Sequence, residues 1–298
     1  MRFTIFIILL ITGLLVSAQG FISYDYFSSS RMRETPGSRL GSGGMYLVSG
    51  SYNIPLVVKM HDESRPTSWA INISAVFAEM SNKGESATLN PGSIINSGLS
   101  IIHLRPLSEK WDILASLGGG VFAPADEISA KSILGSGGVI FIYRMNDNLS
   151  LGAGGGITNS YGPPMAVPML YLSWQKKGKF SCRIDMTTGI KISASTRLWK
   201  QLHLEFTPME VDGLTAVMKV DGKDKIYSMA MLQSYLSPEY RFTDKFTLFA
   251  RFGGNWIRGV SISNRSLKGF FDSFKDDDKE DPYFQAALRL STGIKFKF

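Results

Sequence analysis

The chain has 298 residues, of which 44% are hydrophobic and 19% are charged, whereas a typical soluble domain has about 25% charged residues. A single cysteine excludes an intramolecular disulfide, and three histidines leave little room for histidine-based catalysis or metal binding. The formal charge of +7 is spread along the chain, so no basic patch supports nucleic-acid binding.

The N-terminal residues have the pattern of a secretory signal peptide. A short basic start is followed by an apolar run over residues 3–16 and by small residues before a cleavage point between Ala18 and Gln19. The run is short compared with the ~20 residues of a membrane-spanning helix, although an N-terminal anchor is the alternative. We therefore expect a signal peptide over 1–18 and a mature domain over 19–298.

The mature domain alternates between apolar and polar residues with a period of two, which indicates β-strands. In the last segment, 284–298, every second residue is apolar or Thr, and the interleaved residues are mostly small, polar or basic. The predicted strands cover residues 21–28, 44–55, 69–79, 94–104, 111–122, 132–143, 149–158, 167–174, 180–186, 190–198, 202–211, 225–236, 246–258 and 284–298. We expect an all-β antiparallel transmembrane barrel of about 14 strands, with 12 as the alternative.

Aromatic residues near the strand ends favour a membrane barrel over a soluble sandwich, because such barrels carry aromatic girdles around an apolar band. These residues are Trp69, Trp111, Tyr143, Trp174, Trp199, Tyr240 and Trp256. Similar short polar turns near 105–110, 146–148, 199–201 and 243–245 are typical of the periplasmic side. The segments expected to face outside are 29–43, 81–92, 123–131, 159–165, 212–224 and 259–283, and the connection at 56–67 is long for a periplasmic turn.

Charged side chains within strands should face the lumen, because a charge on the lipid face costs several kcal/mol. The predicted lumen-lining cations are Arg144, Arg183, Lys191, Arg197, Arg251, Arg289, Lys295 and Lys297, and the opposing carboxylates are Asp25, Asp112, Asp185 and Glu205. This excess of positive charge would concentrate anions in the lumen. The alternative is a ladder of ion pairs that fills the barrel and conducts nothing.

The whole mature chain resembles bacterial outer-membrane β-barrel proteins, and it is similar to uncharacterised families of the Bacteroidetes type. The resemblance is carried by the signal peptide, the alternating strands and the aromatic C-terminus. It implies location in the bacterial outer membrane, contact with outer-membrane lipid, and an assembly signal at Phe296 and Phe298 for the barrel-assembly machinery.

Other motifs give weaker indications of chemistry. The glycine runs at 118–120 and 152–156 lack the residues of a phosphate-binding loop and are better interpreted as strand glycines. The acidic run at 272–281 could bind a divalent cation, but its spacing favours a solvated loop. All three histidines, His61, His103 and His203, fall near predicted periplasmic turns, which disfavours an outer-membrane enzyme.

The sequence thus predicts a non-enzymatic, cofactor-free and metal-free barrel. Its expected function is porin-like passive passage of small anionic or neutral solutes. A non-conducting structural or surface-interaction barrel is the alternative, and an outer-membrane enzyme is the least favoured.

Overall fold

The structure is a computed structural model that describes residues 18–34, 37–62, 65–159, 165–176, 180–185, 190–266 and 281–298. The predicted signal peptide lies outside these residues except for Ala18, and so does the acidic run except for Asp281. Among the described residues, no helix is long and apolar enough to cross a membrane.

Almost all of the described chain is β-strand, as the period-two pattern predicts. The strands are β1 (Gln19–Glu34), β2 (Ser38–Asp62), β3 (Arg65–Lys83), β4 (Ser93–Pro106), β5 (Trp111–Pro124), β6 (Ile133–Asn146), β7 (Leu149–Thr158), β8 (Met165–Lys176), β9 (Phe180–Asp185), β10 (Ile190–Arg197), β11 (Leu202–Val220), β12 (Lys223–Arg241), β13 (Phe246–Asn264), β14 (Tyr283–Phe284) and β15 (Ala287–Lys297). In the described residues, two short helical segments, α2 (Ser86–Leu89) and η1 (Ala130–Ser132), lie between strands.

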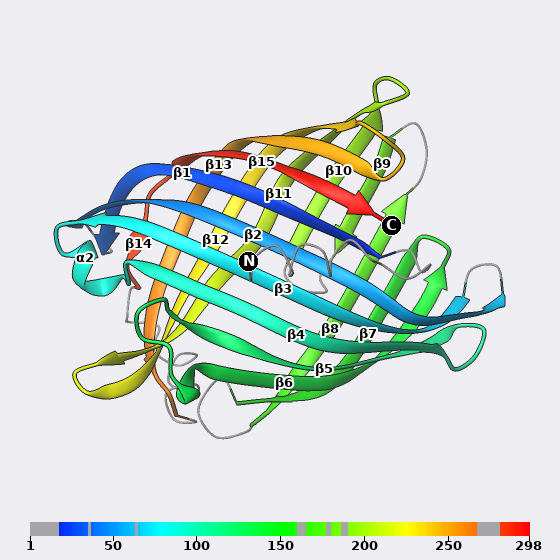
Figure 1. Cartoon of the computed structure of the whole chain (residues 1–298), viewed down its shortest axis with the longest axis horizontal. Helices are drawn as coiled ribbons and strands as arrows, with labels where there is room; N and C mark the ends of the chain where they lie inside the picture. Colours follow the sequence, from blue (N-terminus) through cyan, green and yellow to red (C-terminus); the bar gives the residue numbers. More distant parts are fainter. Residues whose placement is uncertain are drawn as a thin grey trace, which may run out of the picture.

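Each strand pairs antiparallel with its neighbours, and the sheet closes on itself because β1 pairs with β15 (Figure 1). Both β14 and β15 lie between β13 and β1, so together they form one position in the wall. The result is a closed antiparallel barrel of 14 strands, as predicted. Closure pairs the first strand with the last, so neither presents the open edge that a flat sheet would offer to other chains.

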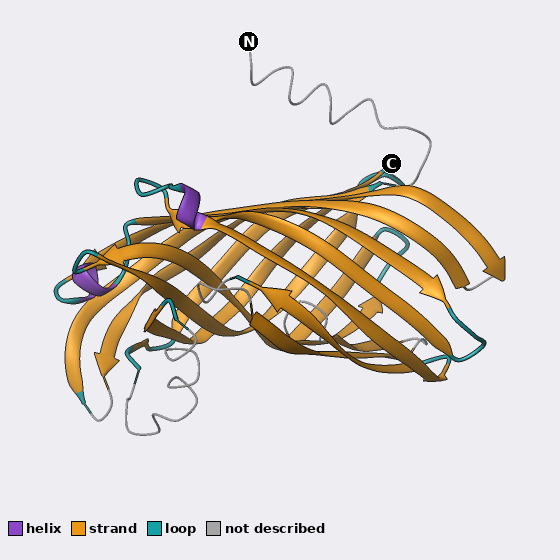
Figure 2. Cartoon of the chain, turned by 90° about the horizontal axis from the view of Figure 1, so that it is seen from below, coloured by secondary structure: helices purple, strands orange, loops and turns teal. Residues whose placement is uncertain are grey.

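The barrel has two different ends. We call the end that holds Gln19 and Lys297 the terminal end, and the opposite end the distal end. The four predicted short turns all lie at the terminal end, between β4 and β5, β6 and β7, β10 and β11, and β12 and β13. Both helical segments lie at the distal end (Figure 2).

Several segments that the sequence analysis assigned to loops are strands, and those predictions were wrong. The outer loop predicted over 212–224 is a continuous hairpin that turns only at Asp221 and Gly222. Both turn residues have positive φ, 52° and 73°, as a two-residue type I′ turn requires. Most of 29–43 also belongs to β1 and β2, and most of 56–67 to β2 and β3. These strands extend beyond the ~9–11 residues that cross a membrane.

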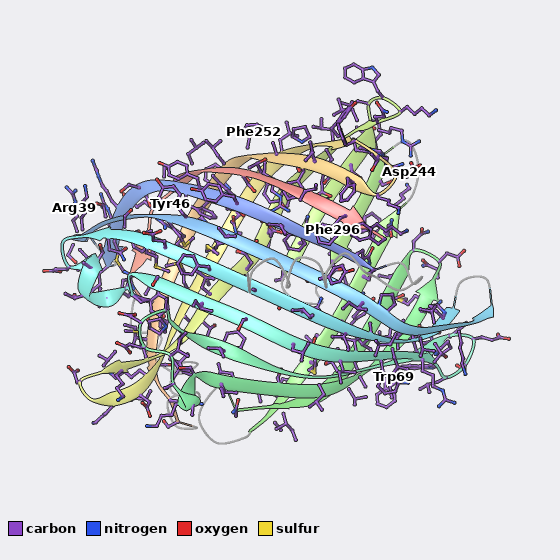
Figure 3. The ribbon with its side chains drawn as sticks, in the orientation of Figure 1. Arg39, Tyr46, Trp69, Asp244, Phe252 and Phe296 are labelled. Carbon is purple, nitrogen blue, oxygen red and sulfur yellow. The ribbon has the colours of Figure 1, made fainter. Side chains whose placement is uncertain are left out.

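The outer surface of the barrel is apolar. Tyr46 and Phe252 point away from the wall (Figure 3) and are 44% and 54% exposed. Many other large apolar side chains are similarly exposed around the barrel, including Leu99, Leu117, Phe141, Leu170 and Leu248. A closed sheet with such a face satisfies its backbone hydrogen bonds internally, which is the requirement for spanning a bilayer with strands.

Aromatic residues gather where the strands meet the terminal end. Trp69 stacks on His103 with ring centroids 4.1 Å apart, and Trp111 lies 5.0 Å from Tyr143. Trp69 and Trp111 are 43% and 45% exposed, so these rings belong to the outer surface. This part of the predicted aromatic girdle is present at the level where aromatic side chains meet a membrane interface.

Candidate functional site in the barrel lumen

Successive side chains of β15 point alternately to the lipid and to the lumen. Leu288 and Leu290 are 53% and 38% exposed, whereas Arg289 between them is 4% exposed. In an antiparallel sheet the residues that pair across strands share a face, so the inner face can be followed around the barrel. This face carries the charged residues and forms the candidate site.

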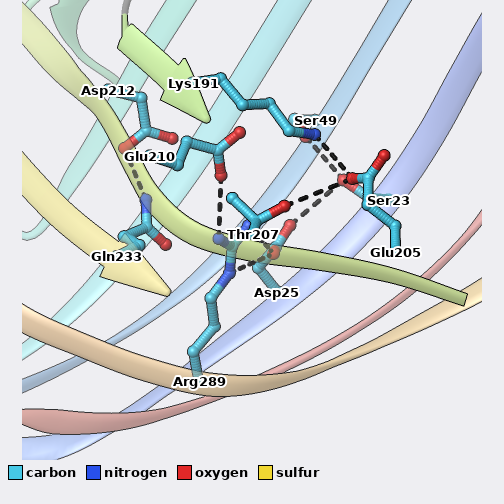
Figure 4. A network of polar contacts seen from close by, with 10 residues as sticks. All are labelled: Ser23, Asp25, Ser49, Lys191, Glu205, Thr207, Glu210, Asp212, Gln233 and Arg289. Atoms are coloured by element: carbon cyan, nitrogen blue, oxygen red, sulfur yellow. Dashed lines mark hydrogen bonds and ion pairs between the residues drawn. The ribbon is translucent and has the colours of Figure 1, made fainter. Parts of the chain in front are cut away.

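Arg289 joins three strands in the interior (Figure 4). Its Nη2 and Nε donate to Asp25 Oδ1 on β1 at 2.8 and 3.1 Å, and its Nη1 donates to Glu210 Oε2 on β11 at 3.2 Å. In the sheet β12 and β13 lie between β11 and β15, so the contact with Glu210 spans these two strands on the inside of the barrel. Asp25 also accepts a hydrogen bond from Ser23 Oγ at 3.1 Å.

Three cations surround the ring of Tyr235, which lies on β12 and is 2% exposed. Arg289, Arg251 and Lys191 lie 4.8, 5.2 and 5.7 Å from its centroid. Lys191 Nζ also donates to Glu205 Oε1 at 2.9 Å. The cation–π contacts and the ion pairs hold the cations in fixed positions on the inner wall.

Two further ion pairs lie on other parts of the wall. Arg144 Nε donates to Asp112 Oδ2 at 2.5 Å between β6 and β5, and Lys295 on β15 pairs with Glu239 on β12. Asp112 is 3% exposed, so the ion pair with Arg144 supplies a hydrogen-bond partner that this buried side chain would otherwise lack. Sequence reasoning selected Arg144, Asp112 and Lys295 but not Glu239.

A cavity of about 300 Å³ lies on the inner side of β9, β10 and β11. Its lining includes Arg183, Asp185, Lys191 and Glu205, all of which the sequence analysis selected, together with Glu210 and Asp212, which it did not. Asp212 Oδ1 accepts a hydrogen bond from Gln233 Nε2 at 2.5 Å. The cavity therefore combines both signs of charge in a space of small-molecule size.

Two of the selected residues lie apart from the others. Arg197 is exposed at the end of β10, where its Nε donates to His203 Nε2 at 3.2 Å. Lys297 is the last residue of β15 and is also exposed. The structure places both at the terminal rim rather than in the central network.

A β-bulge explains why Glu210 and Asp212 escaped prediction. The register of β11 against β12 shifts between Thr207 and Glu210. Strict alternation from Glu205 would turn Glu210 outward, but the bulge turns it inward. Arg258 was also missed, although it is 1% exposed and donates to Ser30 Oγ at 3.0 Å and to the Gly43 carbonyl at 2.8 Å.

The distal half of the interior is an apolar core. Its buried members are Phe27, Met32, Met45, Leu47, Ala78, Met80, Ile94, Leu214, Ala216, Tyr227, Met229, Met231, Val260 and Phe284. They come from β1–β4 and β11–β14, a continuous run of neighbouring strands whose two ends, β4 and β11, contact each other across the barrel. Opposite walls of the barrel thus meet at this level, and flexible methionine side chains fill the space between them.

The outer part of the β11–β12 hairpin, residues 213–230, leans across this end, and we call it the flap. Across the barrel, β11 contacts β4, β5 and η1 (Figure 1). With its amide nitrogen turned toward the Thr215 carbonyl, the Asn96 side chain donates to that oxygen at 2.6 Å and accepts from the Thr215 N–H at 3.1 Å. A cavity of about 260 Å³ remains between Thr215 and the glycine-rich opposite wall.

Polar contacts fasten the tip of the flap. Lys131 Nζ donates to Asp224 Oδ2 at 2.5 Å, and the Lys219 backbone N–H donates to Glu127 Oε2 at 3.2 Å. Asp224 lies beyond the membrane-spanning part of β12, and its hydrogen bond from Lys131 lowers its pKa below the ordinary value. Deeper in, the Tyr227 hydroxyl donates to Asn90 Oδ1 at 2.7 Å. We call the Lys131–Asp224 and Lys219–Glu127 contacts the clasp.

The remaining candidate residues lie near the terminal end or within the strands of the wall. His103 and His203 are near the terminal end, as predicted, and the side chain of His61 lies outside the described residues. The glycine runs lie within β5 and β7. Phe296 and Phe298 pack at the terminal end, 5.6 Å from Tyr52 and 5.6 Å from Phe246 respectively. In the described part of the chain, no group of acidic, histidine or cysteine side chains could hold a metal ion.

A comparison with protein families shows to which family this chain belongs. A family model described as "Domain of unknown function (DUF6268)" matches residues 14–297. The chain belongs to the DUF6268 family. No curated protein matches this chain.

Solved structures that resemble this DUF6268 protein are outer-membrane barrels. An outer membrane channel from Pseudomonas putida F1 is 10% identical over 96% of each chain, with a TM-score of 0.49. The KdgM porin in complex with oligogalacturonate is 7% identical, with 93% and 99% coverage and a TM-score of 0.29. The outer membrane protease OmpT from Escherichia coli is 9% identical, with 95% and 97% coverage and a TM-score of 0.28.

These similar structures include both channels and a protease, so they do not indicate a substrate for this barrel. The location follows from the molecule itself, because a closed sheet with an apolar outer face is the solution that strands adopt in the outer membrane. The DUF6268 chain is a bacterial outer-membrane β-barrel.

Proposed function

We propose that this barrel is a narrow passive channel for small solutes. The observation that carries the proposal is the polar inner wall of the terminal half, where ionised side chains line a cavity of about 300 Å³. Barrels of about eight strands are filled by side chains, and those of 16 or more enclose an aqueous channel. A barrel of 14 strands leaves room for a restricted water-filled path.

The positive and negative charges on the inner face are nearly equal in number. This balance favours neutral solutes over the anionic solutes that the sequence also predicted. We propose lumen-lining roles for Arg144, Arg183, Lys191, Arg197, Arg251, Arg289, Lys295 and Lys297 and for Asp112, Asp185 and Glu205. The inner face also carries Glu210, Asp212 and Glu239, which reduce the expected excess of positive charge. Four of the cations already contact carboxylates, so little unpaired charge remains to attract anions.

Single-channel recording in a planar bilayer with a salt gradient tests the proposal. We expect discrete steps of low conductance and a reversal potential near zero. A strong anion preference would support the original basic-lumen prediction instead. If protein shown to be folded by heat-modifiable gel migration gives no steps, the channel proposal fails.

A non-conducting structural barrel is the second candidate, and the apolar distal core favours it. Opposite walls meet there through Met32, Met229 and their neighbours, and the flap covers them. In this case the same recording gives no current even after the flap is removed. The terminal positions of His103 and His203 give an outer-membrane enzyme less support than either candidate.

We also propose the processing and assembly route that the sequence predicts. Export would remove residues 1–18 between Ala18 and Gln19, and mass measurement of the protein from membranes checks this. Phe296 and Phe298 would be recognised by the barrel-assembly machinery, so F298S should lower the amount assembled in cells while leaving refolding in detergent intact. A Bacteroidetes-type origin remains a prediction.

A further inference from the structure

Arginines gather on the outer face of the wall at the distal end. Met32 of β1 is completely buried in the distal core, so its neighbours Arg31 and Arg33 point away from the core to the outer face. Arg39 of β2 is paired with Arg33. Because residues that pair across antiparallel strands share a face, Arg39 lies on the outer face as well.

A lysine of the third strand joins these arginines. Ser42 of β2 is paired with Arg31 on one side and with Lys83 of β3 on the other, so the two cations flank it on the same face. Arg31, Arg39 and Lys83 are exposed, and Arg33 is half-buried. We call Arg31, Arg33, Arg39 and Lys83 the basic cluster.

The basic cluster has no counter-charge within the described chain, where none of its members forms an ion pair. By contrast, Lys131 at the flap pairs with Asp224, and Arg265 donates to the Lys131 carbonyl. Arg33 and Arg39 oppose each other directly, and like charges in such a pair destabilise a sheet. An anion bound between them would remove this repulsion.

The strand β3 shows the level of the basic cluster relative to the membrane. Trp69 and Glu79 lie on the same outer face and are ten residues apart, which is the length that crosses the hydrocarbon core, ~9–11 residues. Glu79 therefore lies at the distal interface, and Lys83 lies about 13 Å further along the strand. Figure 3 shows the same order, with Arg39 beyond Tyr46 at the distal end and Trp69 toward the other end.

An aromatic hollow lies on the membrane side of the basic cluster. Tyr24 and Tyr46 stack with their ring centroids 6.1 Å apart. Together with Val48, Phe77 and Glu79 they line a hollow of about 280 Å³. Glu79 is exposed, and its carboxylate pairs with no cation of the described residues. The hollow therefore offers ring faces together with a carboxylate that accepts hydrogen bonds from hydroxyl groups.

These levels match the parts of a phosphorylated glycolipid. Its acyl chains would lie on the apolar wall, a sugar would lie beside Tyr46 and Glu79, and a phosphate would lie at the basic cluster. Arginine binds phosphate oxygens through paired, charge-assisted hydrogen bonds. A simple phospholipid has its phosphate directly at the interface, where the carboxylate of Glu79 would repel it.

We propose that the outer face of β1–β3 at the distal end binds a phosphorylated glycolipid of the outer leaflet. The short turns at the terminal end are typical of the periplasmic side, so the distal end lies at the outer leaflet. The inference does not depend on the channel function, because this surface lies outside the lumen.

Native mass spectrometry of the mature barrel in detergent tests the inference, with bisphosphorylated lipid A as the probe. We compare the wild type with R31Q K83Q, which removes two exposed cations of the basic cluster. The matched control is K110Q K200Q, which removes two exposed cations from the turns at the terminal end. Each barrel is checked for folding by heat-modifiable migration. Dephosphorylated lipid A, phosphatidylglycerol and inorganic phosphate are the comparison ligands.

We expect the wild type to bind one lipid A, and R31Q K83Q to bind it about tenfold more weakly because two charged contacts to phosphate are lost. The control K110Q K200Q should bind like the wild type, and dephosphorylated lipid A should bind about as weakly as R31Q K83Q binds the phosphorylated form. Equal losses in the two double variants, or equal affinity for phosphatidylglycerol, would overturn the proposal. Displacement of lipid A by millimolar inorganic phosphate would assign the basic cluster to free phosphate instead.

A separate variant tests the position of the sugar. E79Q keeps the size of the side chain but replaces a charged hydrogen-bond acceptor with a neutral one. We expect lipid A to bind about threefold more weakly to E79Q, while the weak binding of phosphatidylglycerol does not fall. Unchanged or tighter binding of lipid A would contradict the proposed arrangement, because the phosphate rather than the sugar would then lie beside Glu79.

Discussion

The two halves of the lumen are built on the same alternating strands but have opposite linings. In the distal half, buried side chains such as Met32, Met229 and Phe284 pack across the barrel. In the terminal half, Arg289 reaches Asp25 and Glu210 through charged hydrogen bonds. Apolar contact removes water and holds walls together, whereas ionised groups retain nearby water. We therefore propose that the distal half closes the barrel and that solutes pass through the terminal half.

The largest effect should come from removing the cation at the centre of the polar half. R289A leaves the carboxylates of Asp25 and Glu210 without their partner inside the barrel. Breaking a buried ion pair by removing one partner costs ~3–5 kcal/mol. We expect a loss of this size in the free energy of unfolding, measured by urea titration in lipid vesicles.

The control for this variant is R197A, which removes an exposed cation at the rim. It should change stability by less than ~1 kcal/mol. Equal losses of unfolding free energy for R289A and R197A would show that the central network is not desolvated. The contrast between the polar and apolar halves of the lumen would then not hold.

The apolar half is tested by creating a cavity in it. M229A removes a side chain that is 2% exposed and packs in the distal core. Such a truncation costs ~2–5 kcal/mol, and the urea titration should show it. L170A truncates a side chain that is 69% exposed to lipid and serves as the control. A loss no greater than that of L170A would contradict a packed distal core.

A smaller effect is expected where a single hydrogen bond joins the flap to the opposite wall. Y227F removes the hydroxyl that donates to Asn90 and leaves the ring in place. The loss should be ~1 kcal/mol by the same titration. Y24F, on a lipid-facing ring that is 45% exposed, should leave stability unchanged, and a matching loss there would argue against a specific role for Tyr227.

The smallest effect concerns the clasp and depends on pH. The pKa of Asp224 is lowered by the hydrogen bond from Lys131, with Lys219 and Arg265 also nearby. The ion pair is therefore present at neutral pH and is lost as the pH falls through this lowered pKa. At neutral pH, D224N should spend more time in the conducting state than the wild type.

On acidification the wild type should approach D224N, so that the two channels become alike at low pH. Open probability in single-channel records measures this. A difference that persists at acid pH would show that the carboxylate acts through something other than its charge.

The sequence was sufficient to predict the barrel because strand alternation is a local property. The period-two pattern over 246–258 and 284–298 is visible without any tertiary knowledge, and both segments are strands. Strand length was harder to predict, because residues 29–43 and 212–224 contain the Gly, Ser and Asp that also form loops. Their strands continue because partner strands and the opposite wall supply contacts that no local pattern records.

The lumen was predicted in part for the same reason. Alternation along β15 and β1 predicts that Arg289 and Asp25 both face the lumen, where they form an ion pair. Glu210 required knowledge of the bulge after Thr207, and a bulge leaves no reliable mark in one sequence. The apolar core of the flap was not predicted, because residues 212–224 were expected to form a loop. Leu214 follows the bulge onto the same inner face as Asp212, and Met229 is its partner on β12.

The central claim is that the flap closes a channel whose polar half conducts. Deleting residues 216–227 tests it most directly, because Leu214 and Met229 remain paired and Thr215 and Ser228 are left as a two-residue turn. The account predicts a severalfold higher single-channel conductance than that of the wild type and faster swelling of liposomes in neutral sugars. Unchanged conductance in a folded deletion variant would contradict it, because the distal core would then not be the barrier.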